Sequence, residues 1–310
     1  MSFLHFHHHN GAAGENAIDA DGHKAHAAKS SVVAASGLVV MKIVVGIMTG
    51  SLGILAEAAH SALDLVAAVV TFFAVRFSAK PVDREHLYGH GKAENLSALF
   101  ETLLLLLTCI WIVYEAVHRL VAHRIDVEVN VWAYLVMIIS IMVDVSRSRM
   151  LYKVARKYDS QALEADALHF STDIWSSTVV IVGLVCVSLS GIVQGAGFLR
   201  YADSVAAIAV AVIVVQVSLK LGVRTVNALL DSAPAGLSKK VIAAVERIPG
   251  VVNCHHVRLR SSGAQVFVDL HVLLDGNMPL KEAHRLTDVI ESAIREIEPN
   301  ADVVVHPEPH

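Results

Sequence analysis

Long apolar runs separated by short polar links fill the first two thirds of this 310-residue chain. A helix needs about 20 largely apolar residues to cross the hydrocarbon core of a bilayer. Runs of this length predict six spanning helices, at roughly Ser30–Thr49, Leu52–Phe77, Leu96–Val121, Val131–Tyr152, Leu163–Leu189 and Ala202–Val223. The pattern therefore predicts an all-α transmembrane bundle over residues 30–225.

The pattern changes after residue 226, where shorter periodic segments replace the apolar runs. "LSKKVIAAVERIPG" has the spacing of an amphipathic helix that ends at Pro249 and Gly250. Two strands with alternating apolar residues flank the turn "SSG", and "PLKEAHRLTDVIESAIREI" has apolar residues at positions 286, 290 and 294 of a second helix. "ADVVVH" reads as a last strand, so residues 226–310 are predicted to form a small α+β domain of order αββαβ.

Basic residues predict the orientation of the bundle. Cytoplasmic links carry an excess of Lys and Arg. The links after the second and fourth helices are basic, and so are the flanks of the first and last, whereas the tight "TGS" link and the fifth-to-sixth link are not. Both termini and residues 226–310 are thus expected in the cytoplasm. Residues 1–29, which contain "HFHHHNG", show no periodicity and no cleavable signal, and we expect them to be disordered.

Composition agrees with a membrane protein and excludes several classes. The chain is 55% hydrophobic and 17% charged, against about 25% charged in ordinary soluble domains. A formal net charge of −4 gives no reason to expect a nucleic-acid partner. The three cysteines lie far apart without a CxxC pair and are expected to be free. No G-x-x-x-x-G-K-[ST] string is present, so we expect no ATP-driven motor in this chain.

Two predicted helices carry the same pair of ionisable residues. His60 and Asp64 lie four residues apart in the second helix, and His169 and Asp173 have the same spacing in the fifth. Residues at i and i+4 share one helix face. An acid costs on the order of 2.5–3.5 kcal/mol at mid-membrane on insertion scales, so such groups face a cavity or one another. If the two faces meet, two imidazole nitrogens and two carboxylate oxygens form a tetrahedral set suited to Zn²⁺.

Charge balance adds a mechanism to this set. Two carboxylates and two neutral imidazoles carry two negative charges, which one divalent cation cancels. Metal binding requires the deprotonated ligands, so protons replace the metal when it leaves. The alternative is that each His–Asp pair is only a hydrogen bond that tightens helix packing.

The motifs "TGSLGILAEAAHSALDL", "DREHLYGHGKAENL" and "ADALHFSTDIWSS", with the histidine-bearing tail, resemble the cation diffusion facilitator family. The resemblance covers about residues 30–308 and implies a homodimer that exports zinc or related divalent metals in exchange for protons. It also implies a metallochaperone-like (ferredoxin-like) cytoplasmic domain that binds metal and regulates transport. The transport site maps onto His60, Asp64, His169 and Asp173, a set that favours Zn²⁺ while leaving Cd²⁺, Co²⁺, Fe²⁺ and Mn²⁺ open.

The resemblance implies three further groups of residues. A second metal site in the loop would use Asp83, His86 and His90, with a purely structural role as the alternative. Lys92 and Asp231 resemble a charged pair that holds the dimer together. A binuclear site in the tail maps onto His255, His271, His284, His306 and Glu308, with His256 as an adjacent alternative.

Three charged residues in or near the helices keep more than one interpretation. Glu57 lies on a different face from Asp64 and is not expected to be a ligand. Asp144 either lines a cytoplasmic vestibule or pairs with Arg147 or Arg149. Lys42 either reaches the membrane surface or meets an acid such as Glu57.

Taken together, these features favour a secondary transporter in a bacterial inner membrane over three alternatives. An intramembrane metalloenzyme would typically show H-E-x-x-H, which is absent here, and a closed four-ligand set leaves no position for a catalytic water. A metal-responsive sensor or scaffold would not need the intact intramembrane set. A channel would carry metal without proton exchange. No catalytic residue is expected.

Overall fold

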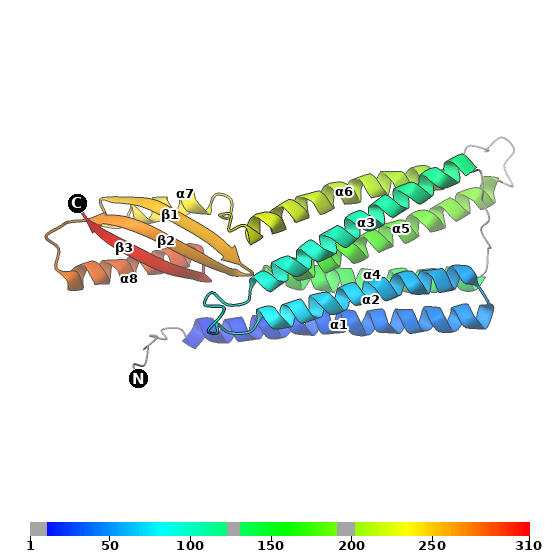
Figure 1. The fold of residues 1–310 in the computed structure, drawn as a ribbon, viewed down its shortest axis with the longest axis horizontal. Coiled ribbons are helices and arrows are strands. Elements are labelled where there is room, and N and C mark those ends of the chain that lie inside the picture. Colours follow the sequence, from blue (N-terminus) through cyan, green and yellow to red (C-terminus); the bar gives the residue numbers. More distant parts are fainter. Residues whose placement is uncertain (1–10, 123–130, 191–201) are drawn as a thin grey trace.

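A computed structural model describes residues 11–122, 131–190 and 202–310 of the chain, and shows a long helical bundle joined end-on to a small α+β domain (Figure 1). The two domains lie along one axis, with the C-terminus at the far end of the small domain. The bundle helices are α1 (Gly11–Thr49), α2 (Leu52–Ser78), α3 (Lys92–Ala122), α4 (Val131–Lys157), α5 (Gln161–Ser190) and α6 (Ala202–Leu229).

Helix α1 begins much earlier than the hydropathy pattern indicates. Residues 11–29 are helical, so the expected disorder is wrong for this stretch. The segment is rich in alanine, which favours helix. The Lys24 ammonium in this stretch is buried and lies 2.8 Å from a carboxylate oxygen of Glu94 on α3. Residues 1–10, including the histidine run at 5–9, lie outside the described residues.

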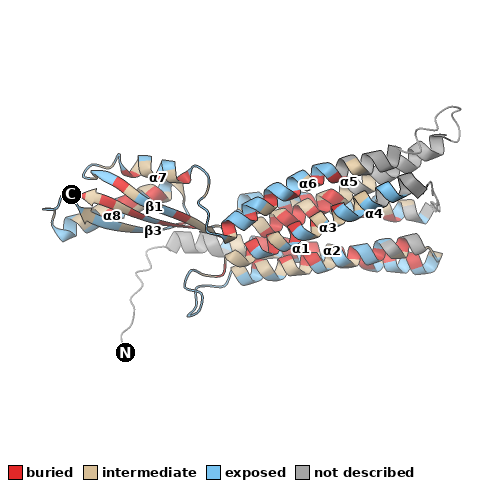
Figure 2. Cartoon of the chain, turned by 45° about the horizontal axis from the view of Figure 1, so that its top comes forward, coloured by how far each residue is buried: buried red, intermediate tan, exposed pale blue. Residues whose placement is uncertain are grey.

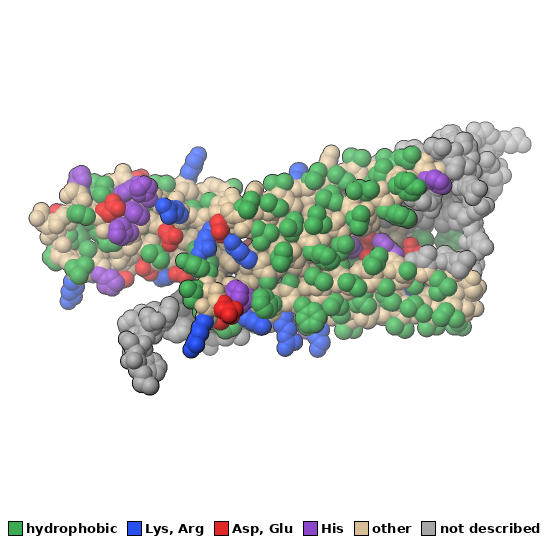
Figure 3. Space-filling model, viewed as in Figure 1, with side chains coloured by type: hydrophobic (Ala, Val, Ile, Leu, Met, Phe, Trp, Pro, Cys, Tyr) green, Lys and Arg blue, Asp and Glu red, His purple; other side chains and the backbone are tan. Residues whose placement is uncertain are grey.

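The outer surface of the bundle is apolar. Large side chains such as Val40, Leu63, Trp111 and Ile213 are exposed, and Figure 3 shows hydrophobic side chains covering the visible flank of the helices. Monomeric soluble proteins rarely expose apolar patches of more than a few hundred Å². Among the described residues, four segments are long and apolar enough to span a membrane: Asp19–Thr49, Glu57–Ser78, Lys92–Tyr114 and Ala211–Leu229.

Polar residues lie inside the bundle instead. Ser31, Thr71, Glu101 and Asp166 are each at most 1% exposed, and Figure 2 shows buried residues where the helices face one another. A tight turn brings α1 and α2 together: Gly50 has a positive φ, and the Ser51 side chain caps α2 at the amide of Ile54. Because the spanning region has a polar interior and an apolar exterior, its charged side chains can be placed toward a common centre.

The cytoplasmic domain has the predicted order αββαβ. Helix α7 (Leu237–Val245) precedes strands β1 (Asn253–Ser262) and β2 (Gln265–Leu274), and α8 (Leu280–Ile297) precedes β3 (Ala301–Pro309). The sheet order is β1-β2-β3, antiparallel between β1 and β2 and parallel between β2 and β3. Alternate β2 residues, Val268, Leu270 and Val272, pack with Val241 and Ile290 of the helices in one core, which leaves His271 on the other face.

The turn between β1 and β2 contacts the bundle at the start of α3. The amide of Gly263 donates a 3.4 Å hydrogen bond to the Asn95 side chain. Gly91 lies so close that a Cβ there would be 2.3 Å from the carbonyl oxygen of Ser262. Tyr88, in the loop before α3, packs edge-on against Phe267 with ring centroids 5.2 Å apart. The α2–α3 loop is therefore fastened to the cytoplasmic sheet.

Candidate metal sites

The two His–Asp faces of α2 and α5 meet inside the bundle. The His169 Nε2 atom lies 3.1 Å from Asp64 Oδ1 across the helix pair and 3.8 Å from Asp173 Oδ2 on its own helix. The His169 side chain is 5% exposed, Asp64 13% and Asp173 17%. One ligand atom from each of the three residues lies within 4.8 Å of the others, which is close enough to hold a single metal ion.

His60 occupies the open side of the same group. Its Nε2 atom is 4.0 Å from Asp64 Oδ1 and 4.0 Å from Asp173 Oδ1. The His60 side chain is 44% exposed, so it is the accessible member of the four. The structure therefore brings together all four residues that the sequence predicts for the intramembrane site.

Ion pairs surround this group and settle two open interpretations. Lys42 donates to Glu57 at 3.0 Å and to Ser61 at 2.8 Å, so it meets an acid rather than the membrane surface. Arg147 donates to Asp144 at 3.3 Å, in agreement with the predicted ion pair. Lys42 and Arg147 therefore each have an acid partner outside the four-residue group.

Sequence reasoning missed several buried polar residues around the site. The Arg147 guanidinium also donates to Ser31 on α1, whose hydroxyl donates to Asp166 of α5. Glu101 on α3 is fully buried, and one of its oxygens lies 3.7 Å from His169 Nδ1. Both Glu101 and Asp166 are acids inside predicted spanning segments, which was the signal that could have marked them.

The loop residues Asp83, His86 and His90 also come together. The Asp83 carboxylate lies 3.2 Å from His86 Nδ1 through Oδ1 and 3.2 Å from His90 Nε2 through Oδ2. Backbone amides of His86 and Glu85 donate to Asp83 Oδ1. The hydrogen bond from the His86 backbone amide is the main reason that the pKa of Asp83 is below its usual range. This carboxylate is therefore ionised and can bind a cation.

Strand register aligns the histidines of the cytoplasmic domain. His255 pairs with His271, and His271 pairs with His306, so the three lie in one row across the sheet. Glu308, two residues beyond His306, returns to the same face. Its carboxylate is 2.7 Å from His271 Nδ1 and 3.1 Å from His255 Nε2. This bond to His271 lowers the pKa of Glu308.

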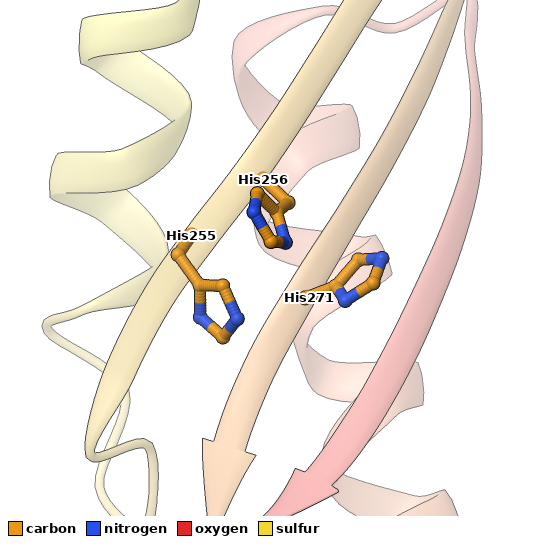
Figure 4. Close-up of side chains that lie close together, drawn as sticks. All are labelled: His255, His256 and His271. Carbon is orange, nitrogen blue, oxygen red and sulfur yellow. The ribbon is translucent and has the colours of Figure 1, made fainter.

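His256 joins this row because of a strand irregularity. The pairing register shifts between His255 and Arg258, and His256 has a φ of 48°. Its ring centroid lies 5.2 Å from that of His271, and Figure 4 shows the rings of His255, His256 and His271 gathered over the two strands. Two three-residue groups result: His255, His256 and His271, and His271, His306 and Glu308. His284 belongs to neither described group and is exposed on α8.

The predicted charged pair forms within one chain. Lys92 Nζ is 2.9 Å from Asp231 Oδ1 and also donates to the carbonyl of Leu229 at 3.2 Å. The pair joins the start of α3 to the end of α6. Since both side chains are more than a third exposed, the ion pair alone contributes at most about 1 kcal/mol.

The fold and these residue clusters define a polytopic membrane protein with a histidine-rich cytoplasmic domain, and comparison with known proteins identifies its family. The model of the cation efflux transmembrane domain matches residues 28–230, and that of the cation efflux protein cytoplasmic domain matches residues 234–310. The chain belongs to the cation diffusion facilitator family.

Curated relatives carry the same assignment. The cation-efflux pump FieF of Yersinia enterocolitica is 34% identical over 286 residues, covering 91% of this chain and 92% of the relative. FieF of Pectobacterium atrosepticum shows the same identity and coverage. The protein is accordingly an integral membrane transporter that exports divalent metal cations, not an enzyme.

Solved structures resemble the cytoplasmic domain. The metal-bound C-terminal domain of the CzcD transporter from Thermotoga maritima is 35% identical, covers 24% of this chain and 86% of that chain, and gives a TM-score of 0.23. The Zn form of CzrB is 30% identical, covers 26% of this chain and 93% of that chain, and gives a TM-score of 0.24.

Proposed function

We propose that the protein exports Zn²⁺ from the cytoplasm in exchange for protons, with His60, Asp64, His169 and Asp173 as the transport site. The observation that carries this proposal is the 3.1 Å approach of His169 Nε2 to Asp64 Oδ1 between two helices, in a buried group with two carboxylates. Two nitrogen and two oxygen ligands suit zinc, and one divalent cation balances the two carboxylates.

Transport follows from competition for the same atoms. Zinc reaches the pocket from the cytoplasm past the loop that carries Asp83 and His90, and loses its water to the four ligands. Rocking of the helices then opens the pocket to the opposite side, where protons displace the ion, because metal binding requires neutral imidazole and ionised carboxylate. The protonated pocket returns, and the proton gradient of a bacterial inner membrane, with both termini in the cytoplasm, drives the cycle.

The cytoplasmic clusters act as regulatory metal sites in this proposal. Glu308 and the row His255, His271 and His306 can hold metal at the sheet surface. The exposed His284 is available to a second copy of the chain, so a homodimer with shared ligands fits its position better than a monomer does. Metal there shifts transport only by binding one conformation of the dimer more tightly than the other.

Reconstituted protein tests the proposal. Proteoliposomes that enclose a pH dye should report proton movement opposite to added Zn²⁺, and an imposed pH gradient should drive Zn²⁺ against its own gradient. Asp64→Ala should abolish both signals while the protein remains dimeric, and Asp288→Ala, an exposed acid on α8, should leave both unchanged. Full activity of Asp64→Ala would refute the site, and zinc flux without coupled protons would indicate a channel.

A further inference from the structure

A carboxylate from a third helix lies next to His169, on the side of its ring away from Asp64 and Asp173. Glu101 on α3 is 0% exposed, and its Oε2 atom lies 3.7 Å from Nδ1 of His169. The other ring nitrogen, Nε2, faces Asp64 and Asp173. His169 thus lies between the four-residue pocket on one side and Glu101 on the other.

The facing atoms of Glu101 and His169 make no hydrogen bond to any described residue. Glu101 Oε2 and His169 Nδ1 are both buried, and neither has a hydrogen-bond partner among the residues that the structure describes. The second oxygen, Oε1, accepts a 3.1 Å bond from the hydroxyl of Thr71 on α2, which holds the carboxyl group in place. A buried carboxyl group with an unpaired oxygen is costly, so its orientation toward an unpaired nitrogen calls for a function.

Metal-binding histidines supply the physical reason. A histidine that binds metal through one nitrogen usually donates the N–H of the other to a carboxylate, which fixes the ring orientation and raises the basicity of the ligand. We propose that Glu101 is such a positioning residue: it accepts the Nδ1–H of His169 and so presents Nε2 to the transported ion. This inference rests on the proposed transport site.

The distance specifies what must happen when the ion binds. At 3.7 Å the two atoms are within ion-pair range, but hydrogen bonds between nitrogen and oxygen are about 2.7–3.2 Å long. An ion on Nε2 leaves the proton on Nδ1, and a small rotation of either side chain then closes the gap. Glu101 belongs to α3 and His169 to α5. Any shift of α3 against α5 during transport would therefore weaken the Glu101–His169 hydrogen bond and lower the affinity of the site for the ion.

Cobalt binding tests the proposal without measuring transport. Co²⁺ in a tetrahedral site absorbs visible light, and the component of this absorption that Asp64→Asn removes belongs to the intramembrane site. We expect Glu101→Leu to weaken this component's Co²⁺ affinity about 10- to 100-fold. Glu101→Gln, which keeps the shape and an acceptor oxygen, should lose less. Thr71→Val removes one hydrogen bond to Oε1 but keeps the carboxylate itself, so its Co²⁺ affinity should stay closer to wild type than to Glu101→Leu.

Glu94→Gln is the matched control, because it neutralises another buried acid of α3 that contacts Lys24 and not His169. It should lower the melting temperature but leave the Co²⁺ affinity unchanged. Wild-type Co²⁺ affinity in Glu101→Leu would overturn the positioning role. A loss of Co²⁺ affinity in Glu94→Gln as large as that in Glu101→Leu would overturn it as well. If Asp64→Asn removes no absorption at all, the transport site itself is wrong and the inference falls with it.

Discussion

The two histidines of the proposed transport site differ in their surroundings. His169 is 5% exposed and lies 3.1 Å from Asp64, whereas His60 is 44% exposed and lies 4.0 Å from both carboxylates. His169 is therefore fixed by its neighbours, while His60 can move to meet an ion. The accessible position is the one at which a substitution can change the ligand set without collapsing the site.

Replacing that accessible ligand should change metal preference. His60→Asp turns the set into one nitrogen and three carboxylates, which suits harder cations better than zinc. We expect this variant to keep transport but to raise the flux of Mn²⁺ and Fe²⁺ relative to Zn²⁺, measured one metal at a time in proteoliposomes under the same pH gradient. His169→Ala should lose all fluxes. An unchanged metal ratio in His60→Asp would mean that His60 is not a ligand.

The sequence predicted which four residues come together better than it predicted the residues that surround them. A spacing of four residues places His60 with Asp64, and His169 with Asp173, on single helix faces whatever the tertiary structure. Two matching faces then predict a common pocket, as the structure shows. The contribution of Glu101 depends on how α3 is rotated and where it packs, and no local pattern encodes that rotation.

At the scale of helices, a buried ion pair joins the cytoplasmic ends of the bundle. Lys24 of α1 donates to Glu94 of α3 at 2.8 Å, and the two side chains are 7% and 2% exposed. Glu94 also accepts from Ser78, the last residue of α2, and from Ser160, just before α5. One carboxylate therefore holds four helical segments together.

Breaking this pair from one side should be more damaging than removing it. Glu94→Leu leaves the Lys24 ammonium buried with only Asp21 beside it, so we expect a loss of about 3 kcal/mol in the free energy of unfolding. Adding Lys24→Met to Glu94→Leu should restore much of this loss, because no unpaired buried charge remains; Asp21, the other partner of Lys24, is 34% exposed and reaches solvent. Unfolding of the detergent-solubilised protein followed by circular dichroism measures both, and a double variant less stable than Glu94→Leu would contradict the account.

Helix α1 shows where hydropathy stops being informative. The apolar run predicts a start near Ser30, but the helix begins at Gly11 and carries Lys24 into a buried contact. Hydropathy reports the length that faces lipid, whereas the backbone continues as a helix wherever propensity and packing allow. The αββαβ order was predictable for the opposite reason, because its short amphipathic periods directly reflect one buried face.

For the whole molecule, the contact between the two domains links the α2–α3 loop to the cytoplasmic sheet. The β1–β2 turn contacts Gly91, the residue before α3. Lys92 and Asp231 join α3 to the end of α6, and Tyr88 packs on Phe267. Arg260 lies over the Tyr88 ring, 3.8 Å from its centroid. The loop that carries Asp83, His86 and His90 is thus linked to the sheet that carries the histidine row. The sequence indicates both domains but not this contact, which joins residues far apart in the chain.

A single methyl group should loosen this contact. In Gly91→Ala the new Cβ would lie 2.3 Å from the Ser262 carbonyl oxygen, so the β1–β2 turn must move away from α3. We expect faster amide hydrogen exchange at residues 261–264, measured by mass spectrometry on the full chain. Gly37→Ala is the matched control: no atom lies within 4 Å of its added Cβ, and exchange at 261–264 should not change. Equal exchange in both variants would show that the turn does not rest on Gly91.

The central claim is that α2 and α5 together form one pocket that holds a single doubly charged ion with nitrogen and oxygen ligands. X-ray absorption at the zinc edge tests it most directly, in a variant whose loop and cytoplasmic clusters are removed by Asp83→Ala, His90→Ala, His255→Ala, His256→Ala and His271→Ala. The account predicts one bound zinc per chain with four nitrogen or oxygen neighbours at about 2.0–2.2 Å, lost when Asp64→Asn is added. Zinc that remains bound with the same coordination after Asp64→Asn would contradict it.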